Sequence, residues 1–276
     1  MMKKILALSI FALLLASCDK IEQPLKNEYG FVPLPDSSSK VILLEEFTGT
    51  SCNNCPKAAA KAKEFQQTFP GQVVLLAIHA GGFAIPNEKH PVDFRTETGN
   101  AIYDQFTPIG VPSGMFNRSG DPETVLLSGW DDAIARELSK PALLALNPTL
   151  SYDEASKEMR LRTEVIATSN LPAGNYYFSA MLYEDSIVAP QTLPDGTTID
   201  KDYVHMHVLR DKLTASPFGE ALVNGAINNG AAYAKSYSIT INPDWNLEHL
   251  GVVFFVYDRN LSEDTYEVIQ AGSAHL

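Results

Sequence analysis

The residues with the clearest chemical potential are two cysteines separated by two asparagines, Cys52 and Cys55. A C-x-x-C pair can be half of a metal site, a structural crosslink or a redox dithiol. Zinc requires about four ligands, and the chain holds one further cysteine, Cys18. A crosslink that closes so short a loop adds only about 2 kcal/mol on the chain-entropy model. We therefore interpret the pair as a redox dithiol that can form a disulfide.

A reactive C-x-x-C pair needs its first sulfur at a helix N-terminus, where the helix dipole and free N–H groups favour the thiolate. Residues 41–47 form an apolar run typical of a strand buried on both faces. Residues 53–69 have helical periodicity, and residues 72–79 predict a second buried strand. We expect Cys52 to be exposed at the start of this helix and Cys55 to be shielded within its first turn.

This strand, turn, helix and strand unit resembles the thioredoxin family. Glu46-Phe47 lie where the family has an acidic residue and Phe, six positions before the first cysteine. Residues 106–120 are similar to the segment that contains the family's cis-proline, with Val111-Pro112 at the matching positions. Ser51 replaces the usual Trp and Asn53-Asn54 replace Gly-Pro, so the redox potential does not carry over. The resemblance covers about residues 40–140 and implies an α/β thioredoxin-like fold.

The same resemblance implies a role for each matching residue. Cys52 would attack as the thiolate, and Cys55 would resolve the mixed disulfide. Glu46 would manage the proton, although a hydrated acid at a strand end is an alternative for this residue. Pro112, if cis, would place the backbone of Val111 beside the Cys52 sulfur to contact an extended substrate.

Further elements are expected before residue 140. The sequence predicts a helix over residues 92–106, a strand over 124–127 and a helix over 130–139. Residues 81–91 resemble an insertion, which either lines the active face or forms a longer surface loop.

From Pro141 onward the pattern changes to that of an all-β domain. Residues 159–165 and 176–182 alternate as half-buried strands do, and residues 252–257 suit a central strand. Several strands without a long amphipathic helix predict an immunoglobulin-like β-sandwich over residues 141–276.

Two histidines in this half, His205 and His207, lie two residues apart. On a strand they would share one face, while Val204, Met206 and Val208 would face the core. Such a pair can begin a metal site, but further ligands are not evident, and hydrogen-bonded histidines at a sheet surface are the favoured interpretation. We assign no metal and no cofactor to the chain.

The N-terminus has the pattern of an export signal. Lys3 and Lys4 precede an apolar run over residues 5–16, which is too short to span a bilayer as a helix. The run ends in Leu15-Ala-Ser-Cys18, which resembles the bacterial lipobox; an ordinary signal with a stray cysteine is the alternative. We predict a signal peptide at residues 1–17, a lipidated Cys18 and a tether over residues 18–40.

Composition limits the class of protein. The chain has 276 residues, 45% hydrophobic and 20% charged, which indicates a folded protein rather than a disordered one. This length favours two domains, predicted at residues 41–140 and 141–276. The formal net charge of -12 argues against nucleic acid as a partner.

The whole chain also resembles the thioredoxin-like outer-membrane lipoproteins of the 28-kilodalton type, through residues 44–56, 112–118, 203–210 and 253–258. This resemblance implies a bacterial cell-envelope protein held by its N-terminal lipid in the outer membrane. Two functions follow. The first is a membrane-anchored oxidoreductase that acts on the thiols or disulfides of extracytoplasmic proteins. The second is a binding or adhesion lipoprotein in which the thioredoxin-like domain is a scaffold.

Overall fold

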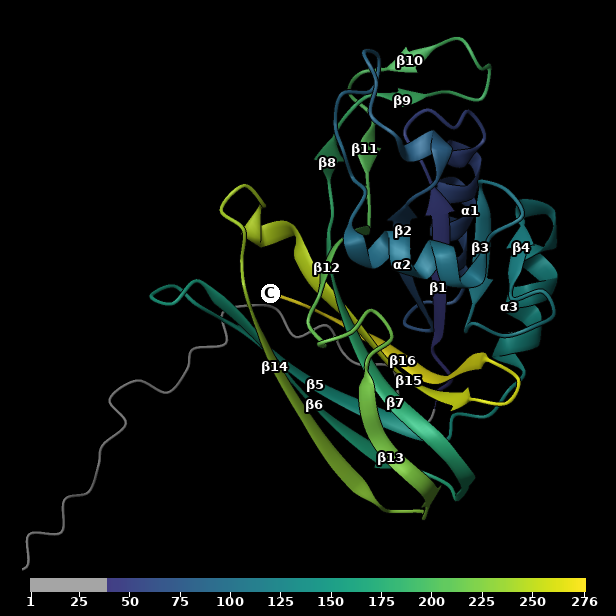
Figure 1. Ribbon diagram of the computed structural model, residues 1–276, viewed down its shortest axis with the longest axis vertical. Coiled ribbons are helices and arrows are strands. Elements are labelled where there is room, and N and C mark those ends of the chain that lie inside the picture. The colour runs from purple at the N-terminus through teal and green to yellow at the C-terminus, as the bar shows by residue number, and fades with distance from the viewer. Residues whose placement is uncertain (1–38) are drawn as a thin grey trace, which may run out of the picture. The chain divides into compact units, whose positions relative to one another are not determined.

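The computed structural model describes residues 39–276, and Figure 1 shows the arrangement of its elements. The predictions for the signal peptide, for Cys18 and for the tether up to residue 38 lie outside the described residues. The helices are α1 (Cys55–Thr68), α2 (Glu97–Phe106) and α3 (Trp130–Leu138), with 3-10 helices η1 (Gly82–Ala84), η2 (Leu127–Gly129) and η3 (Leu247–His249). No helix in this part of the chain is long and apolar enough to cross a membrane.

The first part of the chain contributes four strands in the order β2-β1-β3-β4. They are β1 (Ile42–Thr48), β2 (Val73–His79), β3 (Ser113–Phe116) and β4 (Thr124–Leu126). β1 runs parallel to β2 and antiparallel to β3. Every residue of β1 and β2 is buried, as the two apolar runs predicted. One face packs against α1 and α3 through a cluster that includes Leu44, Phe65 and Trp130.

Helix α2 is shorter than the sequence predicted. It begins at Glu97 rather than at residue 92, because Thr96 caps its N-terminus in an extended conformation. The Thr96 hydroxyl accepts a hydrogen bond from the Gly99 amide at 2.8 Å. The apolar residues of the helix, Ile102 and Phe106, pack on the sheet face opposite α1.

The remaining strands extend this sheet and build a second one. They are β5 (Leu144–Asp153), β6 (Glu158–Ala167), β7 (Leu171–Glu184), β8 (Ile187–Val188), β9 (Gln191–Thr192), β10 (Ile199–Asp200), β11 (Val204–His205), β12 (Val208–Lys212), β13 (Glu220–Ile227), β14 (Ala232–Thr240), β15 (Leu250–Asn260) and β16 (Thr265–His275). The nine-stranded sheet has the order β16-β15-β7-β12-β2-β1-β3-β4, with β13 beside β7, and a three-stranded sheet has the order β14-β6-β5. A second apolar cluster, including Leu161, Phe178 and Phe254, lies between the two sheets.

The large sheet therefore runs through both segments that the sequence assigned to separate domains. β12 meets β2 at one pair, Val208 opposite Ala77, and the Ala77 amide donates to the His207 carbonyl at 2.8 Å. The described residues all belong to one compact unit. The division at residue 140 stays a prediction.

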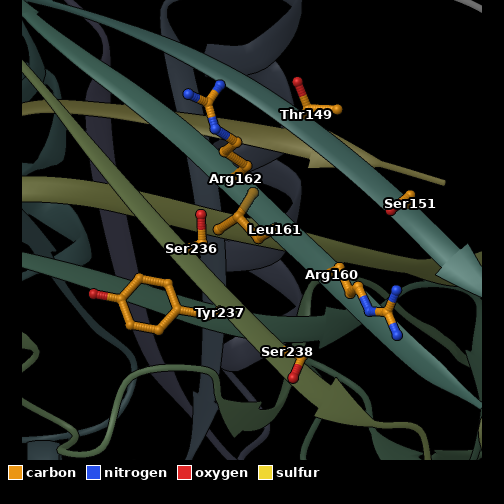
Figure 2. Close-up of a pocket in the computed structure, with 8 residues that line it drawn as sticks. All are labelled: Thr149, Ser151, Arg160, Leu161, Arg162, Ser236, Tyr237 and Ser238. Carbon is orange, nitrogen blue, oxygen red and sulfur yellow. The ribbon is translucent and has the colours of Figure 1, made fainter. Parts of the chain in front are cut away.

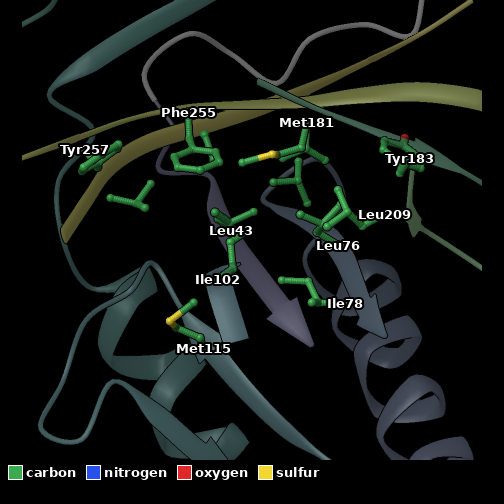
Figure 3. Close-up of a cluster of buried hydrophobic side chains, with 14 of the residues drawn as sticks. Leu43, Leu76, Ile78, Ile102, Met115, Met181, Tyr183, Leu209, Phe255 and Tyr257 are labelled. Atoms are coloured by element: carbon green, nitrogen blue, oxygen red, sulfur yellow. The ribbon is translucent and has the colours of Figure 1, made fainter. Parts of the chain in front are cut away.

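Apolar residues from both halves also share one core. Figure 3 shows Leu43 and Leu76 of the first half in the same cluster as Met181 and Phe255 of the second. The alternation predicted for β6 is confirmed, since its burial follows every second residue. β7 differs from the prediction of a half-buried strand, because residues 178–184 are buried on both faces. Its second face packs against the first half, which sequence alternation within the strand does not reveal.

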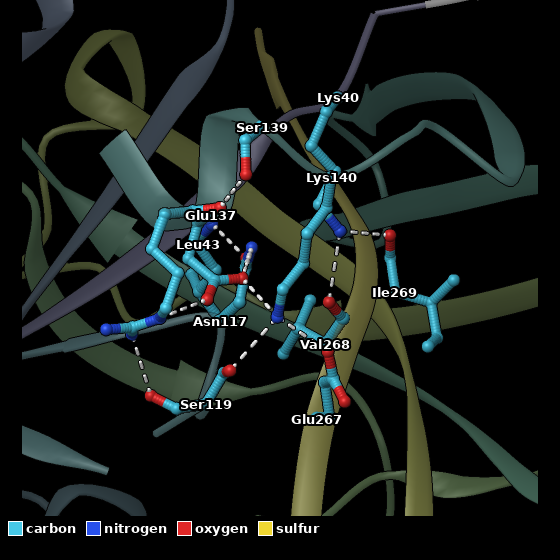
Figure 4. Close-up of polar contacts among 11 residues, drawn as sticks. Lys40, Leu43, Asn117, Ser119, Glu137, Ser139, Lys140, Glu267, Val268 and Ile269 are labelled. Atoms are coloured by element: carbon cyan, nitrogen blue, oxygen red, sulfur yellow. Dashed lines mark hydrogen bonds and ion pairs between the residues drawn. The ribbon is translucent and has the colours of Figure 1, made fainter. Parts of the chain in front are cut away.

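A polar cluster also connects the first half of the chain to the second, as Figure 4 shows. The side chain of Asn117 accepts from the Leu43 amide at 2.9 Å and donates to the buried carboxylate of Glu137 at 3.0 Å. The Asn117 carbonyl accepts from the Val268 amide of β16 at 2.8 Å. The Lys140 ammonium lies 3.0 Å from Glu137 and 2.7 Å from Glu267. These bonds hold the β3–β4 connection against β16.

A fully buried ion pair lies beside this cluster. Arg118 donates two hydrogen bonds to the Glu45 carboxylate, at 2.8 and 2.6 Å, and both side chains are 0% exposed. The guanidinium carbon is 4.8 Å from the ring centroid of Phe255 and 5.2 Å from that of Phe106. The pair therefore connects β1 to aromatic residues from both halves of the chain.

We predict that Arg118→Met lowers the free energy of unfolding by about 3–5 kcal/mol, because it leaves Glu45 buried without a partner. The Glu45→Leu/Arg118→Met double variant should lose less than the Arg118→Met single variant, since it removes both charges. Urea denaturation measures all three values. The matched control is Arg162→Met, which breaks an exposed pair with Glu164 and should change stability by less than about 1 kcal/mol. Additive losses in the double variant would contradict this account.

Candidate functional site

The dithiol lies in the turn between β1 and α1. Cys52 and Cys55 form a disulfide with 5.5 Å between their Cα atoms. The turn is closed by a hydrogen bond from the Cys52 amide to the Gly49 carbonyl at 3.1 Å. α1 begins at Cys55 with Pro56 in its first turn, where a proline costs no hydrogen bond. The sequence predicted both the disulfide and its place before the helix.

Val111 and Pro112 lie beside the dithiol. β3 starts at Ser113, and its pairing with Phe47 brings the preceding residues to the end of β1. The Sγ atom of Cys52 is 3.7 Å from the Val111 carbonyl oxygen. The Val111–Pro112 peptide bond is cis. The tertiary structure thus brings together residues that are about sixty positions apart, as expected from the motif.

Glu46 is a buried acid on β1, the strand that precedes the dithiol turn. It is 7% exposed, and its Oε1 atom has no hydrogen-bond partner within the described residues. Side chains alternate along β1, so Glu46 faces the same side as Leu44, which packs in the α1 cluster. Burial raises the pKa of Glu46 to about 8. Of the two alternatives for this residue, the hydrated strand-end acid is wrong.

The expected exposure of Cys52 is also wrong, because both cysteines are 2% exposed. The connection between β7 and β12 contacts the backbone of the dithiol turn. We call residues 186–206, which contain β8 to β11, the arm. The Gln191 amide Nε2 donates to the Cys52 carbonyl at 2.8 Å, and the Thr192 amide donates to the Thr50 carbonyl at 3.0 Å. Figure 1 shows β8 to β11 at the end of the sheet where α1 begins.

The segment over residues 81–91 lines the same turn. The Phe83 carbonyl accepts from the Ser51 amide at 3.1 Å and from the Ser51 hydroxyl at 2.7 Å. The His90 ring nitrogen Nε2 lies 3.0 Å from the Thr192 hydroxyl of the arm. The Phe83 side chain is nevertheless 49% exposed. The segment is therefore a surface loop that also borders the dithiol.

The interpretation of residues 203–208 as one regular strand is wrong. The backbone of His207 has φ 55, which ends β11 and separates it from β12. As a result His205 is buried, whereas Val204 and Met206 are 48% and 45% exposed. His207 instead closes the base of the arm, with its Nδ1 atom 2.9 Å from the Asp185 carboxylate. Residues 39–276 contain no group of three side chains suited to hold a metal ion.

His79 is a buried residue next to the arm that the sequence analysis missed. It ends β2 opposite Thr48, and its Nδ1 atom has no hydrogen-bond partner within the described residues. Its ring centroid is 5.6 Å from that of His205. Burial lowers the pKa of His79 to about 3 and that of His205 to about 4, so both rings are neutral at pH 7. Burial, and then the charge of Glu46, raise the pKa of Tyr203.

No local signal marks Gln191 or His79. Gln191 lies 139 residues from Cys52, and only the tertiary structure joins them. The indirect signal in the sequence is the unusual length of the connection between two paired strands, since hairpin loops usually have two to five residues.

A second hollow lies away from the dithiol, on the three-stranded sheet. Figure 2 shows its lining, in which Arg162 is flanked by Thr149 and Ser236, and Arg160 by Ser151 and Ser238. The arginines lie 2.9 Å from Glu158 and 3.0 Å from Glu164 on the same strand. Because carboxylates already pair with both guanidinium groups, we place the candidate site at the dithiol.

The fold and the site define a mixed α/β protein with a large sheet and a C-x-x-C disulfide. The model of the family described as "Outer membrane protein Omp28" matches residues 99–275. The chain therefore belongs to the Omp28 family, and its location is the outer membrane of the cell envelope. The matched residues begin within α2, so the dithiol turn precedes them. No curated protein sequence matches the chain.

Solved structures support the fold. The structure of HBP35 of Porphyromonas gingivalis has a TM-score of 0.67 at 17% identity and covers 86% of this chain and 76% of its own. A protein from Agrobacterium tumefaciens has a TM-score of 0.51 at 13% identity, covering 86% of this chain and 95% of its own. A domain of the outer membrane lipoprotein Omp28 from P. gingivalis covers 49% of this chain and 88% of its own at 17% identity, with a TM-score of 0.33 that bears no weight on the fold.

We predict that Glu46→Gln changes the pH dependence of stability. Because burial raises the pKa of Glu46 to about 8, the folded protein binds more protons than the unfolded chain between about pH 4.5 and 8. The wild type should therefore lose stability relative to Glu46→Gln as pH rises through this window, by up to about 1.4 kcal/mol per pH unit. Above pH 8 the difference should level off.

Urea denaturation of the oxidised protein at several pH values measures this difference. Glu64→Gln on the exposed face of α1 is the matched control and should track the wild type. A pH-independent difference between Glu46→Gln and the wild type would refute the assignment.

Proposed function

We propose that the protein is a membrane-anchored extracytoplasmic thiol–disulfide oxidoreductase that uses its C-N-N-C dithiol on protein substrates. The observation that carries this proposal is the Cys52–Cys55 disulfide before α1, with the Val111 carbonyl 3.7 Å from the Cys52 sulfur. A disulfide in so short a loop contributes little to stability. Its position at a helix N-terminus suits chemistry instead.

The finer description of the fold belongs to the same proposal. The strand order β2-β1-β3-β4, with α1 and α3 on one face and α2 on the other, supports a thioredoxin-like fold for residues 41–140. The packing of β5, β6 and β14 against the large sheet supports a sandwich of immunoglobulin type for residues 141–276.

The proposed reaction exchanges one disulfide for another. In the reducing direction, the Cys52 thiolate attacks a substrate disulfide, forms a mixed disulfide and releases one substrate thiolate. The Cys55 thiolate then attacks the Cys52 sulfur, releases the second substrate thiolate and forms the Cys52–Cys55 disulfide. The substrate gains two electrons and the protein loses two. The reverse sequence oxidises a substrate dithiol and starts from the disulfide form described here.

Glu46 and the Val111–Pro112 segment complete the proposed site. A carboxyl group with a pKa of about 8 can take the proton of a thiol as it is deprotonated and return it later. The Val111 backbone would contact an extended substrate segment, while Pro112 offers no competing N–H donor.

The second candidate function is binding or adhesion, with the first half as a scaffold. The burial of both cysteines favours it, since a dithiol at 2% exposure is not open to a partner protein in this conformation. Trapping experiments on the cysteines discriminate between the two functions.

We predict that Cys55→Ala accumulates mixed disulfides with extracytoplasmic proteins, because the resolving thiol is absent. Cys52→Ala should trap few partners. Non-reducing electrophoresis of cells that express each variant measures the adducts, and the double variant is the control for nonspecific crosslinking. Equal absence of adducts in both single variants would favour the binding function.

We further propose that Cys18 is acylated and anchors the mature chain. Two or three acyl chains bind a membrane durably, whereas one binds marginally. We predict that Cys18→Ala abolishes labelling by radioactive palmitate and releases the protein from the membrane fraction. Unchanged labelling and membrane association in this variant would rule out the anchor.

A further inference from the structure

The arm is a long connection between β7 and β12, which pair with each other. β7 ends at Glu184, and β12 returns beside it with Val208 opposite Glu184. The base of the arm is pinched by Asp185, which accepts from the His207 amide at 2.6 Å. Within the arm, β8 pairs with β11 and β9 with β10, two residues each. The arm is thus a small structured unit that leaves the sheet and returns to it.

The base and the tip of the arm are held differently. At the base, Ala189 is buried in a small cluster with Phe94 and Val208, and His205 packs against Phe94 at 5.1 Å between ring centroids. Toward the tip, Gln191 and Thr192 donate hydrogen bonds to the carbonyl groups of Cys52 and Thr50, the Thr192 hydroxyl lies 3.0 Å from His90 Nε2, and Gly196 lies close to the Asn53 side chain. Residues 195–198 beyond them are exposed. Few interactions therefore keep the tip on the turn.

The hydrogen bonds of the tip occupy a particular set of acceptors. Thr50 and Cys52 are two residues apart, and both are buried. The carbonyl group of each accepts a hydrogen bond from the arm. A buried carbonyl without a donor is costly. An extended polypeptide presents N–H groups at every second position on one edge, so it can supply both donors when the arm leaves.

We infer that the arm is an internal competitor for the substrate site of the dithiol, which an extended segment of an unfolded or partly folded protein displaces. This inference rests on the proposed function. Gln191 is the positioning residue that holds the tip through the Cys52 carbonyl. A folded protein with a surface disulfide lacks free N–H groups to replace those of the arm, so it is a poor substrate.

The first test measures access to Cys52 in the full-length protein. In a Cys55→Ala background, Cys52 is a free thiol that cannot close a disulfide within the site. Its alkylation by iodoacetamide is followed across pH, so that the rate at high pH reports access and the midpoint reports the thiolate. Gln191→Ala removes the donor to Cys52, and Thr192→Pro removes the amide donor to Thr50 together with the hydroxyl beside His90. We expect each variant to raise the high-pH rate at least fivefold. The midpoint should stay unchanged.

The matched control is Lys201→Ala, an exposed arm residue without a contact to the turn among the interactions of the described residues. It should alkylate at the parent rate. Unchanged high-pH rates in both donor variants would overturn the inference. A shift of the midpoint alone would overturn it too, because the hydrogen bonds would then act on the thiolate rather than on access.

A second measurement needs no variant. Hydrogen exchange of the native oxidised protein should show the Thr192 amide exchanging at least tenfold faster than the amides of β15, because the tip opens without global unfolding. Equal exchange of Thr192 and β15 would show that the arm opens only with the whole fold, and would refute the competitor.

The substrate class is tested with a short unstructured peptide that carries one cysteine as a mixed disulfide with thionitrobenzoate. A folded protein carrying the same activated cysteine is the comparison. In the Cys55→Ala parent, we expect Cys52 to exchange faster with the peptide than with the folded protein. The ratio of the peptide rate to the folded-protein rate should be smaller when Gln191→Ala is added. If Gln191→Ala speeds alkylation but neither probe exchanges, the arm limits access to Cys52 without a substrate to compete with. That result would refute the oxidoreductase function. Equal rates for both probes in the parent would refute the substrate class alone.

Discussion

The pairing of β12 with β2 is the constraint on which the rest of the structure depends. Without it, β2 would be an edge strand of the first half with unpaired backbone groups. The Ala77 amide instead donates to the His207 carbonyl, at the point where the arm rejoins the sheet. Because β12 follows the arm directly, this bond fixes the end of the arm beside β2, whose other neighbour β1 leads to the dithiol turn. The position of the arm is therefore a consequence of how the sheet is completed.

The junction between the halves is buried and polar as well as apolar. The Glu45–Arg118 pair is fully buried among aromatic rings from both halves, and such a pair tolerates the loss of neither partner. Asn117 connects β1, α3 and β16 through hydrogen bonds with defined directions. Apolar packing alone would allow the halves to shift against each other. These directional contacts select one register, so the dithiol and the arm meet in a single arrangement.

This arrangement gives the dithiol an unusual setting. A reactive C-x-x-C pair is expected at the surface, yet here Cys52 is buried and its carbonyl is bonded to the arm, while Glu46 and His79 are buried on β1 and β2. A neutral acid and a neutral imidazole are compatible with burial because neither carries a charge at pH 7. The buried titratable groups and the arm are therefore separate features of this region: the first lie on β1 and β2, and the second reaches the dithiol turn from the connection between β7 and β12.

The sequence by itself determined the local features of this protein. Short-range periodicity predicts the buried strands β1 and β2, the helix after the dithiol and the alternation of β6. The resemblance to the thioredoxin motif predicts that Val111 lies beside Cys52. Only the tertiary structure decided that β7 is buried on both faces, that His205 and His207 face different surroundings, and that Gln191 bonds to the Cys52 carbonyl. The physical reason is range: periodicity reports which face of an element is apolar, but a contact across 139 residues depends on how completed sheets meet.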